Sequence, residues 1–316
     1  MINKIDCKLI DRIDYILHVA DIHIRNWKRH KEYKEVFTNL YAAVEKLPAN
    51  SIVTIGGDIA HAKTDMSPEL VHMIADFFTQ LGNRVPTIVI AGNHDTNLNN
   101  NQRLDVLTPI VETLDHPNVF YLRDSGVYQI GDATISVMSL LNPKDSYPVL
   151  SSANLEPNSK RIAMYHGTIA NSKVDSGLGI VHGLDWDLFA GYDVVLLGDI
   201  HKRQILSESQ PLMFYPGSLI QQNFGESYDG HGYALVDLTQ ASPLVSMVDI
   251  ANQYGFYTIE ISNNQLPTQL PITNKTNVRL VVSGTSAAEI KDIVTQLHKQ
   301  YGVSDVGINN LDQLSK

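Results

Sequence analysis

The sequence of 316 residues contains a single cysteine, Cys7. One thiol cannot form an intrachain disulfide or a cysteine-based metal site, so any metal ion must be held by oxygen and imidazole ligands. The sequence also lacks an apolar run near the ~20 residues that a bilayer span needs. Its first residues lack the continuous apolar stretch of a secretory signal. We therefore expect a cytoplasmic protein that does not enter a membrane.

Positive charge is scarce as well. Lys and Arg number 24 against 34 Asp and Glu, which gives a net charge of −10. Such a balance is unusual for a nucleic-acid-binding protein, whose affinity depends largely on cations that meet phosphates. Histidine is abundant in contrast, with 12 residues, and several of them lie next to Asp or Asn in short segments. Imidazole and carboxylate are therefore the expected ligand set.

The first third of the chain alternates apolar strands with amphipathic helices. Segments 15–20, 51–58 and 85–95 are predicted to be strands that lead into polar loops, and 33–47, 67–81 and 101–114 to be helices. This alternation predicts an α/β core whose sheet is buried on both faces. Ligands of such sheets collect beyond the carboxyl ends of the strands. His18 lies within the first strand and is expected to be a core residue with satisfied hydrogen bonds.

The later part of the chain is richer in strands. It predicts two stacked mixed β-sheets flanked by helices, an α+β four-layer variant of the α/β class. After about residue 245, a strand, a polar linker, a second strand and a helix near 286–301 predict a small α+β domain. We therefore divide the chain into residues 1–245 and 246–316.

Five short segments place metal-binding side chains directly after apolar strands. They are Asp21-Ile22-His23, Gly57-Asp58, Gly92-Asn93-His94-Asp95, His166-Gly167 and Gly198-Asp199-Ile200-His201. One Asp-x-His pair after a strand is common by chance, and a capping or surface role would then be the better explanation. Five such segments, with glycines that let the backbone approach an ion closely, favour a metal site.

The residue types suit two adjacent divalent ions. Carboxylates supply charge, one of them can bridge two ions, and neutral imidazoles fill the remaining positions. Two ions held side by side activate water and stabilise the oxygens of an in-line displacement at phosphorus. Such a site needs no Ser or Cys nucleophile. The pattern therefore predicts a metal-dependent phosphoesterase.

The ordered set DxH, GD, GNHD, H and GxH resembles the calcineurin-like metallophosphoesterase superfamily. Within it, the chain resembles the SbcD/Mre-type recombination nucleases in ADIHIRNWKRHKEY, in GDIHKRQ, and in FYPGSLIQQNFGE followed by HGYALVDL. The resemblance covers about residues 15–237. It implies a DNA exonuclease and single-strand endonuclease of double-strand-break repair that uses Mn²⁺ or Mg²⁺. It further implies a homodimer that acts with an SMC-like ATPase, and a capping role on DNA for residues 246–316.

The resemblance also implies a ligand set for each ion. One ion would be held by Asp21, His23 and His201, the other by Asn93, His166 and Asp199, with Asp58 as the bridge. The family pattern at the last segment is GHxH, so Asp199 replaces an imidazole. Three carboxylates would then face the four positive charges of two ions, and we expect a harder site that tolerates Mg²⁺ better.

Catalytic roles are implied in the same way. His94 would be the general acid that protonates the leaving sugar oxygen, and Asp95 would orient its imidazole. His61 would face the scissile phosphate. The alternative for His61 is an ordinary solvated histidine at the start of a helix.

Basic residues flank two of the motifs, so DNA could bind there although the net charge of the whole chain is negative. Binding depends on the local potential near a cleft, so Arg25, Lys202 and Arg203 are candidate substrate-binding residues. A solvated helix face is the alternative for the basic residues of 28–34. Trp27 and Tyr33 could stack on bases, but we expect them to pack.

Two other functions are compatible with the sequence. A small-molecule phosphodiesterase or protein phosphatase of the same superfamily would share the metal site, although the basic residues and the extra domain favour a long polyanion. A non-catalytic scaffold is supported only by Asp199; it would be expected to lose several ligands, and here His94 and the other six ligand positions are filled.

Overall fold

The computed structural model of the chain describes residues 2–100, 103–150, 159–180, 182–261 and 265–314. Contacts divide the chain into two compact units, residues 1–219 with 230–250, and residues 220–229 with 251–316. The expected boundary near residue 245 falls inside β13 (Leu244–Asp249), which pairs along its length with β12 (Gly232–Asp237). We therefore place the end of the large unit after Ile250.

The large unit contains a six-stranded mixed sheet in the order β13-β12-β2-β3-β4-β5. The strands after β12 are β2 (Tyr15–Val19), β3 (Ser51–Ile55), β4 (Thr87–Val89) and β5 (Val119–Tyr121). β2 to β5 are parallel to one another, whereas β12 runs antiparallel to β2. The parallel strands carry their carboxyl ends to one edge of the sheet, which is where the first three predicted motifs begin.

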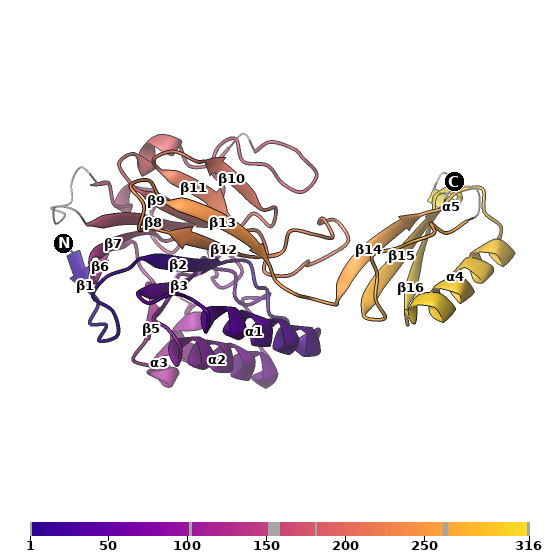
Figure 1. Cartoon of the computed structure of the whole chain (residues 1–316), viewed down its shortest axis with the longest axis horizontal. Coiled ribbons are helices and arrows are strands. Elements are labelled where there is room, and N and C mark those ends of the chain that lie inside the picture. Colours follow the sequence, from indigo (N-terminus) through magenta and orange to yellow (C-terminus); the bar gives the residue numbers. More distant parts are fainter. Residues whose placement is uncertain (1, 101–102, 151–158, 181, 262–264, 315–316) are drawn as a thin grey trace. The chain divides into compact units, whose positions relative to one another are not determined.

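A seven-stranded mixed sheet in the order β1-β6-β7-β8-β9-β11-β10 is stacked on the first (Figure 1). Its strands are β1 (Ile2–Lys4), β6 (Gly126–Ile130), β7 (Ala133–Met138), β8 (Lys160–His166), β9 (Val194–Gly198), β11 (Leu212–Tyr215) and β10 (Gln204–Ser207). Ile16 and Ile52 from one sheet join Ile135, Met164 and Leu196 from the other in one buried cluster. This interior explains why the central strands read as continuous apolar runs.

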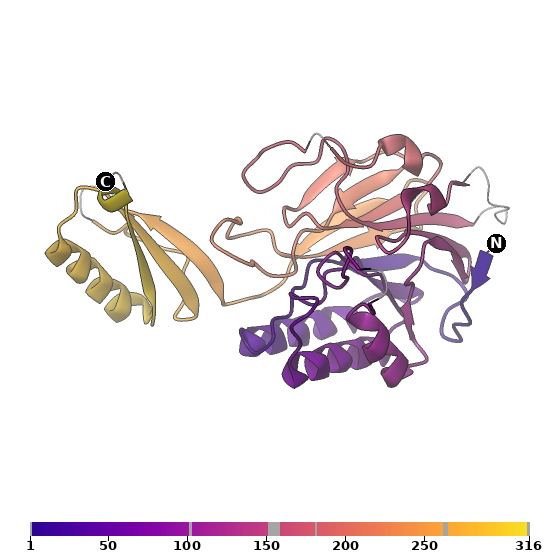
Figure 2. The same ribbon diagram turned by 180° about the vertical axis from the view of Figure 1, so that it is seen from behind.

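Three helices cover the outer face of the six-stranded sheet, as both views show (Figures 1 and 2). They are α1 (His30–Val44), α2 (Pro68–Gly82) and α3 (Leu107–Leu114). Phe37 of α1 stacks on Phe77 of α2 with ring centroids 4.3 Å apart. No helix among the described residues is long and apolar enough to cross a bilayer.

The third helix begins later than the sequence pattern suggests. We expected it to start at residue 101, but α3 begins at Leu107, and residues 101–102 lie outside the described part of the chain. Asp105 accounts for the difference, because its Oδ1 accepts the amides of Leu107 and Thr108 at 3.0 and 2.8 Å and so closes the first turn.

The outer face of the seven-stranded sheet is covered differently from that of its partner. Among the described residues, its helical cover consists of the 3-10 helices Lys144–Ser146 and Trp186–Phe189. Phe189 and Tyr192 pack there in a second buried cluster with Tyr165 and Leu197. The stacked-sheet architecture is therefore as predicted, with loops and short helices in place of a full outer helical layer on this side.

His18 is confirmed as a core residue of the sheet interior. It is fully buried, its Nδ1 lies 2.8 Å from Thr54 Oγ1, and its Nε2 lies 3.0 Å from the carbonyl oxygen of Leu197. Burial lowers the pKa of His18 to about 4, so the ring is neutral at neutral pH.

The small unit holds a three-stranded parallel sheet of β14 (Gly255–Glu260), β15 (Thr276–Val282) and β16 (Val306–Asn310). The helix α4 (Ala287–Tyr301) packs against it through Ile293 and Leu297, and α5 (Leu311–Leu314) follows β16. Ser286 and Glu289 form a capping box at the start of α4. β16 was not predicted, because VGINN is short and has no clear alternation.

Candidate metal centre

The structure brings the five predicted motifs to one place at the strand ends. Asp21, Asp58 and Asn93 follow β2, β3 and β4 of one sheet, whereas His166 ends β8 and Asp199 follows β9 of the other. The backbones of the motifs are also joined. The amide of His23 donates to the Asp58 carbonyl at 2.9 Å, and the amide of Asp199 donates to the Asp21 carboxylate at 3.0 and 3.1 Å.

Asp21, His23 and His201 form the first group of converging ligand atoms. One atom from each lies within 4.8 Å of the others. His23 Nε2 and His201 Nε2 are 2.9 Å apart, so two ring nitrogens point at each other rather than at separate partners. This is the set predicted for the first ion.

Asp21, Asp58 and His166 form the second group, within the same limit of 4.8 Å. Asn93 Oδ1 lies 2.9 Å from His166 Nε2, and Asp199 Oδ1 lies 3.8 Å from the same nitrogen. The structure therefore gathers the three residues predicted for the second ion around His166 Nε2.

Asp58 stands between the two groups. Its Oδ2 is 3.5 Å from His23 Nε2, and its Oδ1 is 3.3 Å from His166 Nε2. A carboxylate whose two oxygens face a ligand of each group has the arrangement that a bridge between two ions requires.

The chemistry of the donor set fits divalent cations. His166 Nδ1 donates to the Gly56 carbonyl at 2.7 Å, which leaves Nε2 as the coordinating nitrogen of the neutral ring. Burial lowers the pKa of His166, but the charges of Asp58, Asp21 and Asp199 outweigh it and raise the pKa to about 10. Carboxylate oxygens around His166 Nε2 therefore stabilise a positive charge at this nitrogen. A metal ion bound to Nε2 can supply that charge in place of the proton.

The buried carboxylates lead to the same conclusion. Asp21 is fully buried, and burial raises its pKa to about 7, although His166 and His201 act in the opposite direction. Burial also raises the pKa of Asp199. Without a nearby cation these carboxylates resist ionisation, so the protein alone does not balance the charge that it places here.

Backbone geometry at the motifs is unusual in a way that supports a functional site. Asp21, His23, Asp58 and Asp199 all have positive φ, at 52°, 54°, 54° and 96°. Non-glycine residues seldom adopt this region, and such strain clusters at functional sites. At Gly92 a Cβ atom would stand 2.1 Å from Asp58 Oδ1, so only glycine lets this loop pass the central carboxylate.

Asp95 has a different role from the predicted one. It is fully buried and accepts the amides of Gly92 at 2.9 Å, Ala60 at 2.8 Å and Ile59 at 3.2 Å. Burial, and then the charge of Asp58, raise its pKa to about 7. Asp95 therefore ties the GNHD loop to the loop after Asp58, and it does not orient the imidazole of His94.

The carbonyl oxygen of His61 takes the orienting position instead. It accepts from His94 Nδ1 at 2.7 Å, which fixes the tautomer and leaves His94 Nε2 free to carry or release a second proton. The rings of His61 and His94 stack with centroids 5.7 Å apart, and His23 is a close neighbour of both. His61 is thus part of the site and not a solvated residue at a helix start.

Arg25 reaches the site through His61. Its Nη1 donates to His61 Nε2 at 2.9 Å, so the neutral His61 ring carries its proton on Nδ1. Burial, followed by the charge of Arg25, lowers the pKa of His61 to about 4. The guanidinium of Arg25 therefore lies beside the metal centre, and its role in substrate binding stays a prediction.

Lys202 and Arg203, the other two predicted basic residues, differ in whether they can contact a substrate phosphate. Arg203 donates to Asp249 Oδ1, to the Val248 carbonyl at 3.1 Å and to the Pro216 carbonyl at 3.3 Å. Arg203 therefore connects two loops through its guanidinium, and the prediction that it binds a substrate phosphate is wrong. Lys202 is half-buried and stays a prediction.

Tyr33 and Trp27 behave oppositely. Tyr33 is fully buried, as expected, and its hydroxyl donates to the carbonyl oxygen of His23 at 2.5 Å. No sequence motif indicated that Tyr33 supports the backbone of His23. Trp27 is 69% exposed, so the expectation that it packs is wrong.

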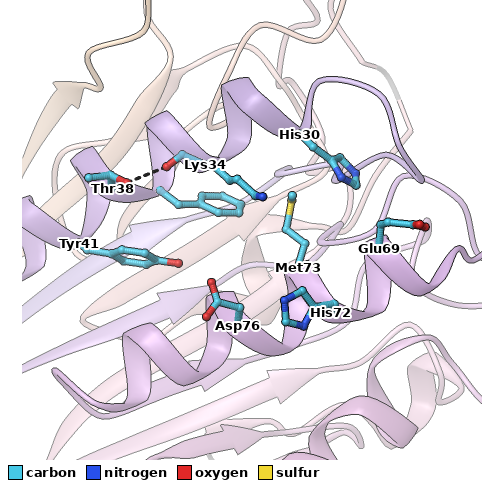
Figure 3. A pocket seen from close by; sticks show the side chains of 9 residues that line it. His30, Lys34, Thr38, Tyr41, Glu69, His72, Met73 and Asp76 are labelled. Atoms are coloured by element: carbon cyan, nitrogen blue, oxygen red, sulfur yellow. Dashed lines mark hydrogen bonds between the residues drawn. The ribbon is translucent and has the colours of Figure 1, made fainter.

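A separate cavity of about 300 Å³ lies between α1 and α2 (Figure 3). Its polar rim comprises His30, Lys34, Tyr41, Glu69, His72 and Asp76. No sequence motif had indicated it. His30 also contacts the metal-site loop, because its Nε2 donates to the carbonyl oxygen of Arg25 at 2.6 Å.

Comparisons with known proteins relate the chain to a family. Residues 15–203 match the family model described as calcineurin-like phosphoesterase. The uncharacterized protein R555 of Acanthamoeba polyphaga mimivirus is 38% identical over 305 residues, which are 93% of this chain and 22% of that protein. The SbcD component of the nuclease SbcCD from Staphylococcus epidermidis is 28% identical over 254 residues, 71% of this chain and 66% of that protein. The solved structure of Pseudomonas putida nuclease MPE aligns with 14% identity and a TM-score of 0.34, over 72% of this chain and 87% of that one.

Proposed function

Because the chain belongs to the calcineurin-like phosphoesterase family, we propose that it is a two-metal-dependent DNA nuclease of double-strand-break repair or recombination. The observation that carries this proposal is the convergence of Asp21, Asp58 and His166 with His23 and His201 at the strand ends. The Staphylococcus relative is named as part of a nuclease, and it is similar along most of this chain. We propose Mn²⁺ as the metal, with Mg²⁺ as the second choice.

Each side chain of the site has a separate role in phosphodiester hydrolysis. When bound, two divalent ions supply an activated water and neutralise charge on the phosphate. His94, with Nδ1 fixed by the His61 carbonyl, presents Nε2 to protonate the leaving sugar oxygen. Arg25, whose Nη1 donates to His61 Nε2, provides the guanidinium donor for phosphate oxygens. Asp95 and Tyr33 hold the loops in register.

Digestion of end-labelled DNA tests the proposal directly. We expect the protein to release nucleotides from linear DNA in Mn²⁺ and to cleave single-stranded circles, while EDTA abolishes both activities. Phosphopeptides and cyclic nucleotides should remain intact. Turnover of either of these without cleavage of DNA would contradict the proposal.

That contrary result would favour the second candidate, a small-molecule phosphodiesterase or protein phosphatase. It shares the metal centre and could also use Arg25 to bind a phosphate, but it does not explain the additional unit. The convergence of Asp21, His23 and His201, and of Asp21, Asp58 and His166, supports a working site over a non-catalytic scaffold.

Asp199 gives a testable difference from the family pattern. We expect Asp199→Ala to lower occupancy of one ion and to reduce activity in Mg²⁺ more than in Mn²⁺, because the variant loses a hard oxygen donor 3.8 Å from His166 Nε2. Asp199→His, which restores an imidazole, should retain both ions and shift preference toward Mn²⁺. Metal content by mass spectrometry and rates in each metal measure this. Unchanged stoichiometry and activity in Asp199→Ala would remove Asp199 from the ligand set.

We further propose assembly with other chains. The Staphylococcus relative is named as one component of the nuclease SbcCD, so an SMC-like ATPase of the SbcC/Rad type is the proposed partner. A homodimer through α2 or α3 is proposed as well. The small unit is proposed to act as a capping domain on DNA.

A further inference from the structure

Trp27 is the only aromatic side chain among the large hydrophobic residues that the structure describes as exposed. Exposed apolar residues are common and by themselves need no explanation. The position of Trp27 sets it apart, because it lies on the short segment between the ligand His23 and the start of α1. Arg25 precedes it on this segment and the exposed Lys28 follows it.

The backbone around Trp27 is firmly held. The carbonyl of Asn26 accepts from Ser67 Oγ at 2.6 Å, and Asn26 Oδ1 accepts the Ser67 amide at 3.2 Å. One residue earlier, the Arg25 carbonyl accepts from His30 at 2.6 Å. The exposure of Trp27 is therefore built into an ordered loop, and the indole is presented to solvent at little further cost in conformational entropy.

This loop also carries a cation at the site, because Arg25 contacts His61. The Cα of Trp27, two residues further along, lies within about 7 Å of the Cα of Arg25. An arginine for a phosphate and an indole for the adjacent base form the pair that single-strand-binding surfaces use. A phosphoserine or phosphothreonine side chain offers no base for the indole to stack on, whereas a DNA strand offers a base beside each phosphate.

We propose that Trp27 stacks on an unpaired base of single-stranded DNA next to the phosphate that enters the metal centre. The inference rests on the proposed nuclease function. It narrows the substrate, because it requires the DNA at the metal centre to be single-stranded. Base stacking on an aromatic side chain corresponds to roughly 5-fold to 150-fold in affinity.

Binding without metal tests the contact independently of catalysis. The chain has only two tryptophans, so in EDTA an oligothymidylate should quench the fluorescence of the wild type and quench that of Trp27→Phe much less. An abasic strand of equal length controls for charge. Trp27→Ala should bind the oligothymidylate ~10-fold to ~100-fold more weakly, whereas Leu178→Ala, which alters an equally exposed residue (71%), should bind like the wild type. Equal quenching by the abasic strand, or unaltered affinity of Trp27→Ala, would overturn the proposal.

Kinetics separate the contact from a general effect on the site. In Mn²⁺, Trp27→Ala should raise KM for the oligonucleotide at least ~5-fold with a much smaller change in kcat, and Trp27→Phe should restore most of the loss. The fall in kcat/KM should be far smaller for an abasic strand of equal length, which has the same phosphodiesters but no bases. Equal losses on both substrates would refute base stacking. A wild type that binds the strand with quenching but never cleaves it would refute the nuclease function while leaving the contact intact.

Discussion

Asp58→Asn is expected to lower kcat/KM for DNA more than about 10³-fold and to release at least one metal ion. Asp58 places one oxygen 3.5 Å from His23 Nε2 and the other 3.3 Å from His166 Nε2, so it is the side chain shared by the two ligand groups. Lewis-acid stabilisation contributes several kcal/mol to such reactions, and about 4 kcal/mol corresponds to 10³-fold in rate. Neutral Asn keeps the size of Asp but not the charge that holds two cations together.

Thermal unfolding distinguishes loss of metal from loss of fold. Mn²⁺ at 100 times its Kd should stabilise the wild type by about 2.7 kcal/mol, and this increment should shrink or disappear in Asp58→Asn. Asp105→Asn is the matched control, because Asp105 is also a buried carboxylate but caps α3. It should lower stability with and without metal and leave metal content unchanged. Full metal occupancy in Asp58→Asn would contradict the bridging role.

The sequence was sufficient for the parts of the site that local pattern encodes. Apolar runs that end in Asp, Asn or His indicated the strands and placed Asp21, Asp58 and His166 at their carboxyl ends. Parallel pairing brings Asp21 and Asp58 together at one sheet edge, and the stacking of the second sheet brings His166 to them. Parallel strands leave little freedom in where their ends lie. The stacked sheets followed from the same runs, because strands that are apolar on both faces need cover on both faces.

Contacts between distant loops could not be predicted in this way. Nothing near Asp95 in the sequence indicates that it accepts amides from Ile59 and Ala60, and the orienting group of His94 is a backbone carbonyl that has no sequence signature. Arg203 looked free until Asp249, from an unpredicted strand, supplied its partner. In each case the sequence showed which chemical groups the residue carries, but not which distant residue it contacts.

Trp27 was mispredicted for the opposite reason. Its apolar character predicted burial, whereas the neighbouring residues Arg25 and Asn26 use their backbone carbonyls to hold the segment at the surface. Hydrophobic pattern reports the average tendency of a side chain, and functional loops depart from it where a ligand completes the contact.

His94→Gln is expected to reduce DNA cleavage about 10²-fold to 10⁴-fold while both metal ions remain bound. General-acid catalysis typically supplies this factor, and His94 has the required geometry, because the His61 carbonyl holds Nδ1 and leaves Nε2 to deliver a proton. The Gln amide can still donate to that carbonyl, so the loops around Asp58 should persist.

The decisive comparison uses substrates with different leaving groups. A sugar oxygen needs protonation as it departs, whereas p-nitrophenolate leaves unaided, so bis(p-nitrophenyl) phosphate hydrolysis should fall far less. His72→Ala, at the α1–α2 cavity, is the histidine control and should cleave DNA normally. A loss of equal size on both substrates would mean that His94 supports the metal centre itself rather than the leaving group.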